Sequence, residues 1–257
     1  MIKLDRSRVK APGSWARAVK KAFPDEDAFR RRAADFEALG IDDPVRRSGF
    51  RSYAPEVLPR KRGKTGSCDF RAIWGRAKAA LAAMSHRKCA YCESPISAER
   101  SAAVEHFRPK ALFPSLVYDW DNYLLGCGGC NGAKADRWPA GGGAYVRPDG
   151  GDDPAMFLIF REDGSVEASP AVPEAAWTIE DLELNREWLR DWRAREIRGA
   201  LAELADLTAR PEIPIEIRAR LAGQILARYL DPEQPYSAAI RQCLLRVLER
   251  ELPSASS

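Results

Sequence analysis

Histidine and methionine are scarce in this chain, and long apolar runs are missing from it. Among 257 residues there are 2 histidines and 3 methionines. No stretch approaches the roughly 18 consecutive apolar residues that a membrane-spanning helix requires, and charged residues begin at Lys3. Since 45% of the residues are hydrophobic, the chain can bury a core of its own. We therefore expect a globular cytoplasmic protein with no membrane contact.

Positive charge is concentrated in the first third of the chain. Residues 1–80 contain 20 Lys and Arg against 10 Asp and Glu, residues 81–152 contain 8 against 8, and residues 153–257 contain 13 against 19. A basic segment is typical of a phosphate-binding surface, because each cation that neutralises a phosphate releases a counterion. A solvated surface of mixed charge explains the same counts. The acidic last third is poorly suited to nucleic acid.

Four of the six cysteines form two pairs, Cys89 with Cys92 and Cys127 with Cys130. In a chain with no secretory signal, this spacing favours metal ligation over disulfides. Each pair directs two thiolates to one point, and two pairs complete the tetrahedral shell of a structural zinc. A rubredoxin-like iron site uses the same ligands, but nothing in the sequence indicates electron transfer, so we favour zinc. Because four cysteines close the shell, any catalysis must come from other residues.

Hydrophobic periodicity predicts helices on both sides of the cysteine pairs. The expected helices cover residues 28–39, 70–84, 185–207, 215–229 and 237–251. Asp163 and Gly164 predict a hairpin turn between strands at 156–160 and 165–167.

Single residues in these elements carry further expectations. Asn185 is expected to cap the helix that follows it. Trp188 and Trp192 on that helix are expected to pack in the core, and the unpaired Cys68 and Cys243 to be buried or half-buried thiols. The sequence thus predicts an α+β protein: a basic, partly helical region (1–84), a zinc-stapled finger (85–140), a loop and β-hairpin (141–177) and a helical region (178–257).

A second set of chemically distinctive residues surrounds the cysteine pairs. Val-Glu-His-Phe-Arg-Pro-Lys occupies residues 104–110, Asp-Asn-Tyr-Leu-Leu occupies 121–125, and Asn131-x-x-Lys134 follows the second pair. A lone histidine is more often a hydrogen-bonded structural residue than a catalyst. Here His106 lies between the pairs with an acidic neighbour, and the combination resembles the HNH (ββα-metal) endonucleases.

The resemblance covers residues 88–138 most specifically. The segment Cys-Ala-Tyr-Cys-Glu, together with the motifs at 104–110 and 118–125, is similar to the HNH nuclease subunit of Septu-type and retron-associated anti-phage systems. Thr178-Ile179 and Leu184-Asn185-Arg186 fit the same group. The resemblance implies a ββα-metal HNH finger between the basic N-terminal and helical C-terminal regions, and a regulatory ATPase as partner.

The resemblance also implies roles for individual residues. His106 would be the general base that activates water, and Glu105 and Asn131 would hold a catalytic Mg²⁺ or Mn²⁺. Asn122 would hold the loop that orients His106. The residues implied to contact backbone phosphates are Arg108, Lys110 and Lys134.

The sequence departs from the family pattern at two of these positions. Glu105 stands where many members have Asp, and Asn131 stands where the third residue is often His. Glutamate is longer by one methylene, which puts the position and identity of the catalytic metal in doubt. Carboxylate and amide oxygens still suit a hard divalent cation, whereas the thiolates suit zinc.

Two classes of function are therefore considered. The first is an HNH endonuclease that hydrolyses phosphodiester bonds, with DNA favoured over RNA. The second is a zinc-stapled module that binds nucleic acid or protein without cutting. A binding module needs only the cysteines, whereas an enzyme also needs Glu105, His106, Asn122 and Asn131, so we favour the enzyme. Tyr118, Trp120 and Tyr123 are expected to pack in the finger core and not to stack on bases.

Overall fold

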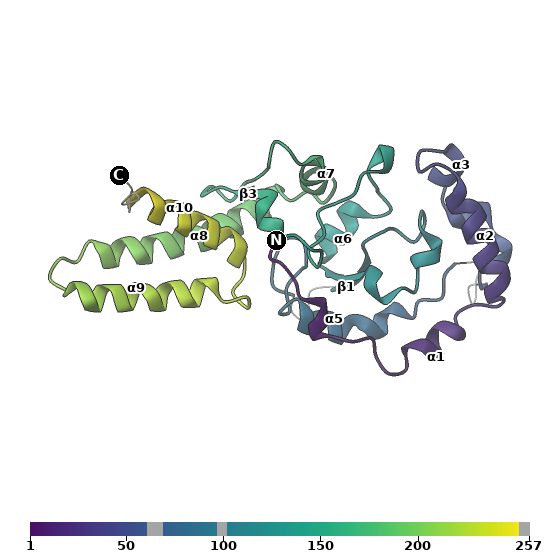
Figure 1. Ribbon diagram of the computed structural model, residues 1–257, viewed down its shortest axis with the longest axis horizontal. Helices are drawn as coiled ribbons and strands as arrows, with labels where there is room; N and C mark the ends of the chain where they lie inside the picture. Colours follow the sequence, from purple (N-terminus) through teal and green to yellow (C-terminus); the bar gives the residue numbers. More distant parts are fainter. Residues whose placement is uncertain (61–68, 97–101, 252–257) are drawn as a thin grey trace.

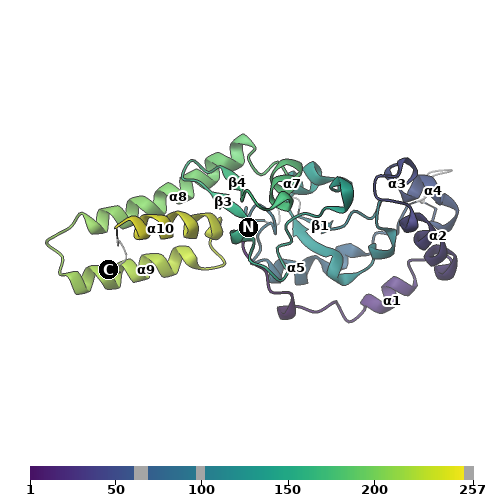
Figure 2. The same cartoon turned by 45° about the horizontal axis from the view of Figure 1, so that its top comes forward.

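The computed structural model describes residues 1–60, 69–96 and 102–251 of the chain. Cys68, for which a buried or half-buried thiol was expected, lies outside this part. The described residues form an α+β protein with two small antiparallel sheets. In both views the helices α8, α9 and α10 lie at one end, α2 and α3 lie at the other, and β1, α5 and α6 lie between them (Figures 1 and 2).

The N-terminal region consists of short helices around an aromatic cluster. Its α-helices are α1 (Trp15–Lys20), α2 (Glu26–Ala38), α3 (Pro44–Arg47), α4 (Phe50–Tyr53) and α5 (Lys78–Met84). The predicted helix at 28–39 is confirmed as α2, which begins after Asp25, whose side chain accepts a hydrogen bond from the Ala28 amide. Its buried face packs Phe29 edge-on against Phe50.

The helix predicted at 70–84 is shorter than its periodicity suggested. A 3-10 helix at Trp74–Ala77 leads directly into α5. Phe70 precedes both helices and stacks on Phe50, with ring centroids 6.2 Å apart. Packing against a distant aromatic ring therefore takes Phe70 away from the helix that local spacing predicted.

The centre of the molecule is an antiparallel strand pair followed by a helix. Strand β1 (Ala103–His106) pairs with β2 (Tyr123–Gly126), so that His106 lies opposite Tyr123. Helix α6 (Gly128–Lys134) begins one residue after Cys127. The Ala90 amide donates to the Leu125 carbonyl, which attaches the first cysteine pair to β2.

The hairpin predicted around Asp163-Gly164 is confirmed. Strands β3 (Leu158–Phe160) and β4 (Val166–Ala168) pair in antiparallel register. Gly164 has a φ of +79°, and a Cβ there would lie 2.1 Å from the Arg190 carbonyl oxygen, so only glycine fits. Helix α7 (Pro173–Asp181), which hydrophobic periodicity did not predict, packs beside β4.

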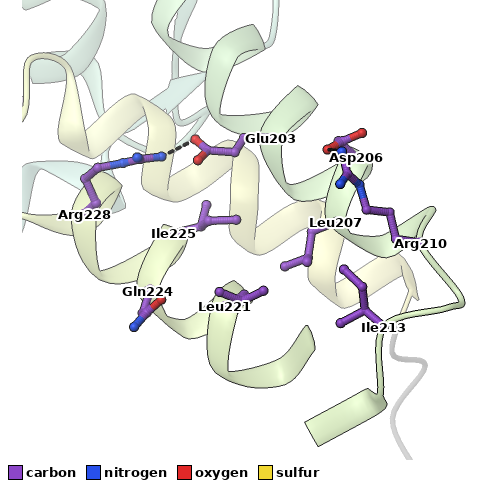
Figure 3. Close-up of a pocket in the computed structure, with 9 residues that line it drawn as sticks. All are labelled: Glu203, Asp206, Leu207, Arg210, Ile213, Leu221, Gln224, Ile225 and Arg228. Carbon is purple, nitrogen blue, oxygen red and sulfur yellow. Dashed lines mark hydrogen bonds and ion pairs between the residues drawn. The ribbon is translucent and has the colours of Figure 1, made fainter. Parts of the chain in front are cut away.

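The three predicted C-terminal helices are confirmed as α8 (Glu187–Thr208), α9 (Ile215–Leu230) and α10 (Ser237–Glu251). None of the residues in α9 is fully buried. A cavity of about 370 Å³ lies between α8 and α9, and its apolar lining includes Leu207, Leu221 and Ile225 (Figure 3). Arg228 and Glu203 form an ion pair at its edge.

Two predictions about α8 are wrong. Asn185 does not cap it, because its amide group instead hydrogen-bonds both the amide and the carbonyl of Val166 on β4. Trp188 and Trp192 are 45% and 46% exposed and lie against Arg186 and Arg195. The buried positions of α8 are taken instead by smaller apolar residues and by Arg193, whose guanidinium lies over the ring of Phe160 on β3.

Within residues 1–60, 69–96 and 102–251, no helix has both the length and the apolar character that crossing a bilayer demands.

Candidate metal centre and active site

The four paired cysteines converge on one point. Their sulfur atoms all lie within 4.8 Å of one another, and the Sγ atoms of Cys92 and Cys127 are 3.8 Å apart. Four sulfurs about 2.3 Å from a tetrahedral zinc would be separated by about 3.8 Å. The donor set and its spacing therefore fit a structural zinc ion. Cys243 is a buried thiol, as predicted.

Backbone geometry explains how the two cysteine pairs meet. The Glu93 amide donates to the Cys89 carbonyl, and Glu93 takes a left-handed φ of 61° that turns the chain after the first pair. The Cys127 amide then donates to the Cys89 sulfur at 3.3 Å. The second pair spans the start of α6, where the Cys130 amide donates to the Cys127 sulfur. Hydrogen bonds from Cys130 and the other cysteines hold the pKa of Cys127 far below its usual value.

His106 is held in one orientation at the end of β1. Its ring lies between Trp74 and Tyr123, both edge-on, with centroids 4.9 Å and 5.1 Å away. Its Nε2 lies 3.1 Å from the Val117 carbonyl oxygen, which can only accept, so Nε2 carries the proton. Burial, with the nearby charge of Lys110, lowers the pKa of His106 to about 3. The ring is thus neutral at physiological pH, with Nδ1 free to accept a proton.

Glu105 and Lys134 form a buried ion pair beside His106. The Lys134 Nζ lies 2.6 Å from the Glu105 Oε1 and also donates to the His106 carbonyl at 3.0 Å. Burial raises the pKa of Glu105, and the ammonium of Lys134 opposes that rise. Lys134 is fully buried, so in this structure it does not face a phosphate backbone as predicted. Its charge is used inside the site, where it contacts the Glu105 carboxylate and the His106 carbonyl.

Asn131 lies next to Glu105 although the two are far apart in sequence. A Cβ built on Gly126 would be 3.4 Å from that of Glu105 and 3.5 Å from that of Asn131. Glu105, His106 and Asn131 all line one cavity of about 600 Å³. A carboxylate residue, an amide residue and a histidine therefore border a common space, and carboxylate and amide oxygens suit a hard cation that keeps several waters.

Asn122 joins the two ends of the segment between β1 and β2. Its Oδ1 accepts from the Arg108 amide at 2.8 Å, and its Nδ2 donates to the carbonyls of Arg108 and Leu116. These bonds hold the loop whose Val117 carbonyl orients His106.

The residues predicted to contact phosphates differ in how far their side chains are exposed. Arg108 is exposed, and its guanidinium packs near Phe113 and Trp138. Lys110 is half-buried, lines the cavity and lies 5.7 Å from the Trp74 ring centroid.

Three further cavity residues were missed by sequence reasoning. They are Trp74, Lys78 and Asp136. Trp74 and Lys78 precede the first cysteine pair, outside the motif, and no local signal distinguishes them from ordinary helix residues. Only the packing of the 3-10 helix at Trp74–Ala77 beside β1 brings them to the site.

The aromatic residues of the finger pack as predicted for Tyr118 and Tyr123, which are 7% and 0% exposed. Trp120 is partly buried and lies edge-on to Trp15.

Some basic side chains in the first third of the chain form hydrogen bonds inside the protein. Arg46 is buried and donates to the carbonyls of Glu37 and Leu39, so it is not available to bind phosphate.

Comparison with known proteins gives two relatives, and no family model matches the chain. The Septu protein PtuB of Bacillus thuringiensis is 46% identical over 65 residues, which is 24% of this chain and 25% of that protein. The Septu protein PtuB of Bacillus mycoides (strain KBAB4) is 26% identical over 209 residues, which is 63% of this chain and 71% of that protein. The chain is thus similar to Septu PtuB proteins, over about a quarter of the length of the first and over more of the second.

Proposed function

We propose that this chain is a metal-dependent HNH endonuclease that hydrolyses phosphodiester bonds in nucleic acid, with DNA favoured over RNA. The observation that carries the proposal is the orientation of His106. Its Nε2 is bonded to the Val117 carbonyl, and the residue lines the same cavity as Glu105 and Asn131. In this reading β1, β2 and α6 are the ββα-metal finger, and zinc at the cysteines holds the helix against the strands.

His106 acts as the general base in this mechanism. A water in the cavity gives its proton to Nδ1 while its oxygen bonds to phosphorus and the bond to the leaving oxygen breaks. The low pKa of His106 keeps the free protein's ring unprotonated. A phosphodiester bound beside the ring adds negative charge, which raises that pKa and makes the ring a better proton acceptor.

Glu105 and Asn131 are the residues that would hold the catalytic cation. A bound Mg²⁺ or Mn²⁺ would polarise the phosphoryl group and offset the charge on the leaving oxygen. Burial raises the pKa of Glu105, and Lys134 opposes that rise because an ammonium 2.6 Å away favours the carboxylate. Lys78 and Lys110 line the cavity and can bind phosphates on either side of the reacting one.

The alternative is a module that binds without cutting. Such a module has no need for a buried carboxylate, an oriented imidazole and an amide at one cavity, which is why the enzyme is favoured. Incubation of the purified protein with plasmid DNA and with RNA, in Mg²⁺, in Mn²⁺ and in EDTA, separates the two. Cleavage that EDTA abolishes supports the nuclease, whereas intact substrates in every metal support the binding module.

Replacing Asn131 with Ala should cause a loss of cleavage that metal partly restores. The substitution removes one neutral oxygen and leaves Glu105 and His106 in place, so it weakens cation binding more than proton transfer. We expect at least about a tenfold loss at low Mg²⁺, partly recovered at high Mg²⁺ or in Mn²⁺, which tolerates imperfect geometry better. Cleavage rates across a titration of each metal provide the measurement. A loss that is the same at every metal concentration would remove Asn131 from the cation site.

The names of the two relatives support a role in anti-phage defence. We propose that the nuclease is the effector of such a system and that the region α8–α10 binds a regulatory ATPase subunit. The support is the exposure of apolar side chains on α9, where Ile215 and Ile217 are 68% and 40% exposed. Exposed apolar side chains are typical of contact surfaces.

The double change Ile215→Glu with Ile217→Glu should weaken co-purification with the ATPase subunit of the same system by at least about tenfold, as expected for central apolar contacts. Met156 is equally exposed at 68% and lies outside α8–α10, so Met156→Glu is the matched control. Pull-down from cells that express both subunits provides the measurement. Equal recovery of the ATPase by the double variant and the control would place the docking surface elsewhere.

A further inference from the structure

The residue that immediately precedes α8 lies against the cysteine cluster. The Nη2 of Arg186 is 3.3 Å from the Cys130 sulfur and 3.8 Å from the Cys127 sulfur. Its Nη1 donates to the carbonyls of Leu182 and Glu183, each at 3.0 Å. The two ends of the guanidinium are thus divided between backbone carbonyls and the second cysteine pair.

Two neighbouring residues, Gly129 and Trp188, lie close around this guanidinium. A Cβ on Gly129 would lie 3.1 Å from the Arg186 Nη2 and 3.3 Å from its Cζ, so a side chain there would crowd the guanidinium. The Trp188 ring lies 4.6 Å from Cζ and covers another side. The exposed Trp188, which was predicted to pack in the core, therefore shields the contact between Arg186 and the sulfurs.

The charge of the cluster explains why a cation belongs there. Four thiolates around one Zn²⁺ carry a net charge of minus two, and three of the four cysteines are buried. Taking such a charge out of water is unfavourable unless a partner of opposite sign is close. Arg186 supplies a fixed positive charge, and a guanidinium holds two acceptors at once where an ammonium acts as a point charge.

The residues that follow the first cysteine pair make similar contacts with α10. The Ser94 Oγ lies 3.0 Å from the Tyr236 hydroxyl, and the Glu93 Oε2 accepts from the Ser237 Oγ at 3.1 Å and from the Ala238 amide at 3.3 Å. The second cysteine pair therefore contacts the residue before α8, and the two residues that follow the first pair contact the start of α10.

We propose that Arg186 is the charge-balancing partner of the zinc site, and that through it zinc holds the helical region α8–α10 against the nuclease finger. The inference rests on zinc at the cysteines and not on cleavage by His106. In this proposal the zinc has a second structural role besides positioning α6. It also holds the helical region α8–α10 in place next to the two cysteine pairs.

The test compares zinc affinity in the full-length chain with Arg186→Gln, Arg186→Lys and Arg190→Gln. Arg190 is the control, since it lies one turn further along α8 and pairs with the exposed Asp163, away from the cysteines. Competition with a chromogenic zinc chelator measures the affinity. We expect Arg186→Gln to bind zinc about 10–100-fold more weakly, as is usual when a partner of metal ligands is lost. Arg186→Lys should recover part of that loss, and Arg190→Gln should match the unmodified chain.

A second pair of variants keeps the proposal falsifiable if Arg186→Gln does not fold. Gly129→Ala leaves Arg186 in the chain but crowds its guanidinium, whereas a Cβ at Gly132 on the same helix meets nothing within 4 Å. Gly129→Ala should therefore weaken zinc binding several-fold relative to Gly132→Ala. Equal zinc affinity within this pair, or within the pair Arg186→Gln and Arg190→Gln, would overturn the role of Arg186.

Hydrogen exchange tests the attachment of the helices without any activity assay. Removing zinc from the unmodified chain with a chelator should lower amide protection in the first turns of α8 and α10, while the middle of α8 stays protected by its own packing. Unchanged protection at both helix starts after zinc removal would show that zinc does not hold the helical region. Neither the zinc-affinity comparison nor the hydrogen-exchange experiment measures cleavage. Both can therefore be interpreted even if the nuclease proposal fails.

Discussion

Replacing His106 with Ala is expected to lower cleavage by about 10²–10⁴-fold, the usual contribution of a general base. The change removes the only described imidazole at the cavity but no cation ligand and no zinc ligand. The variant should therefore keep its zinc, bind nucleic acid and respond to Mg²⁺ as the unmodified chain does. Because no metal can replace a missing proton acceptor, higher Mg²⁺ or Mn²⁺ should not restore activity, in contrast to Asn131→Ala.

The other histidine offers a matched control. His86 lies past the end of α5 and has a left-handed φ of 51°, so His86→Asn is the suitable change, since Asn tolerates that conformation. Its cleavage rate should match that of the unmodified chain. Thermal unfolding of each variant shows whether loss of the buried His106 ring has disturbed the finger. Full cleavage by a folded His106→Ala, or its recovery in added metal, would show that His106 is not the base.

Replacing Cys89 or Cys127 with Ser is expected to release zinc and unfold the finger. Each cysteine belongs to a different pair, and the pairs are joined by the bond from the Cys127 amide to the Cys89 sulfur. For a small site of this kind the binding free energy of zinc, roughly 10–16 kcal/mol in peptides, is itself folding free energy. Loss of one thiolate should reduce zinc from one ion per chain to a small fraction and abolish cleavage, because α6 carries Asn131 and begins at the second pair.

Cys243 is the control for this pair of variants. It is buried in α10, far from the cluster in sequence and outside it in space, so Cys243→Ala should keep one zinc per chain. Zinc content by elemental analysis and thermal unfolding provide the measurements. Retention of one zinc with normal stability in both Cys89→Ser and Cys127→Ser would refute the four-cysteine assignment.

Some features of this protein follow from local sequence. The Cys-x-x-Cys spacing can be read directly because a short loop can direct two sulfurs to one point without help from the rest of the fold. The Asp163-Gly164 hairpin and the helices α2, α8, α9 and α10 were predicted because turn preference and hydrophobic periodicity are properties of neighbouring residues. The motif at residues 104–110 likewise contains several of the residues that line the cavity beside Asn131, Glu105 and His106 among them.

Other features depend on contacts between residues far apart in the chain, which no local pattern encodes. Lysine is usually exposed at the surface, but the fold places Lys134 against Glu105 inside the site. Trp74 reaches His106 only because the 3-10 helix at Trp74–Ala77 packs beside β1.

The sequence by itself predicted the four cysteines that could hold a zinc ion, the β-hairpin and most of the helices. The tertiary structure decided which basic side chains are exposed and which are used for contacts inside the protein. Arg46 and Lys134 are used internally, and Arg186 lies on the cysteine sulfurs, although all three look alike in the sequence. The physical reason is that the sequence sets only the type of each side chain, whereas its charge state and its function depend on whether water, a carboxylate, a carbonyl or a thiolate surrounds it, and only the folded chain sets those surroundings.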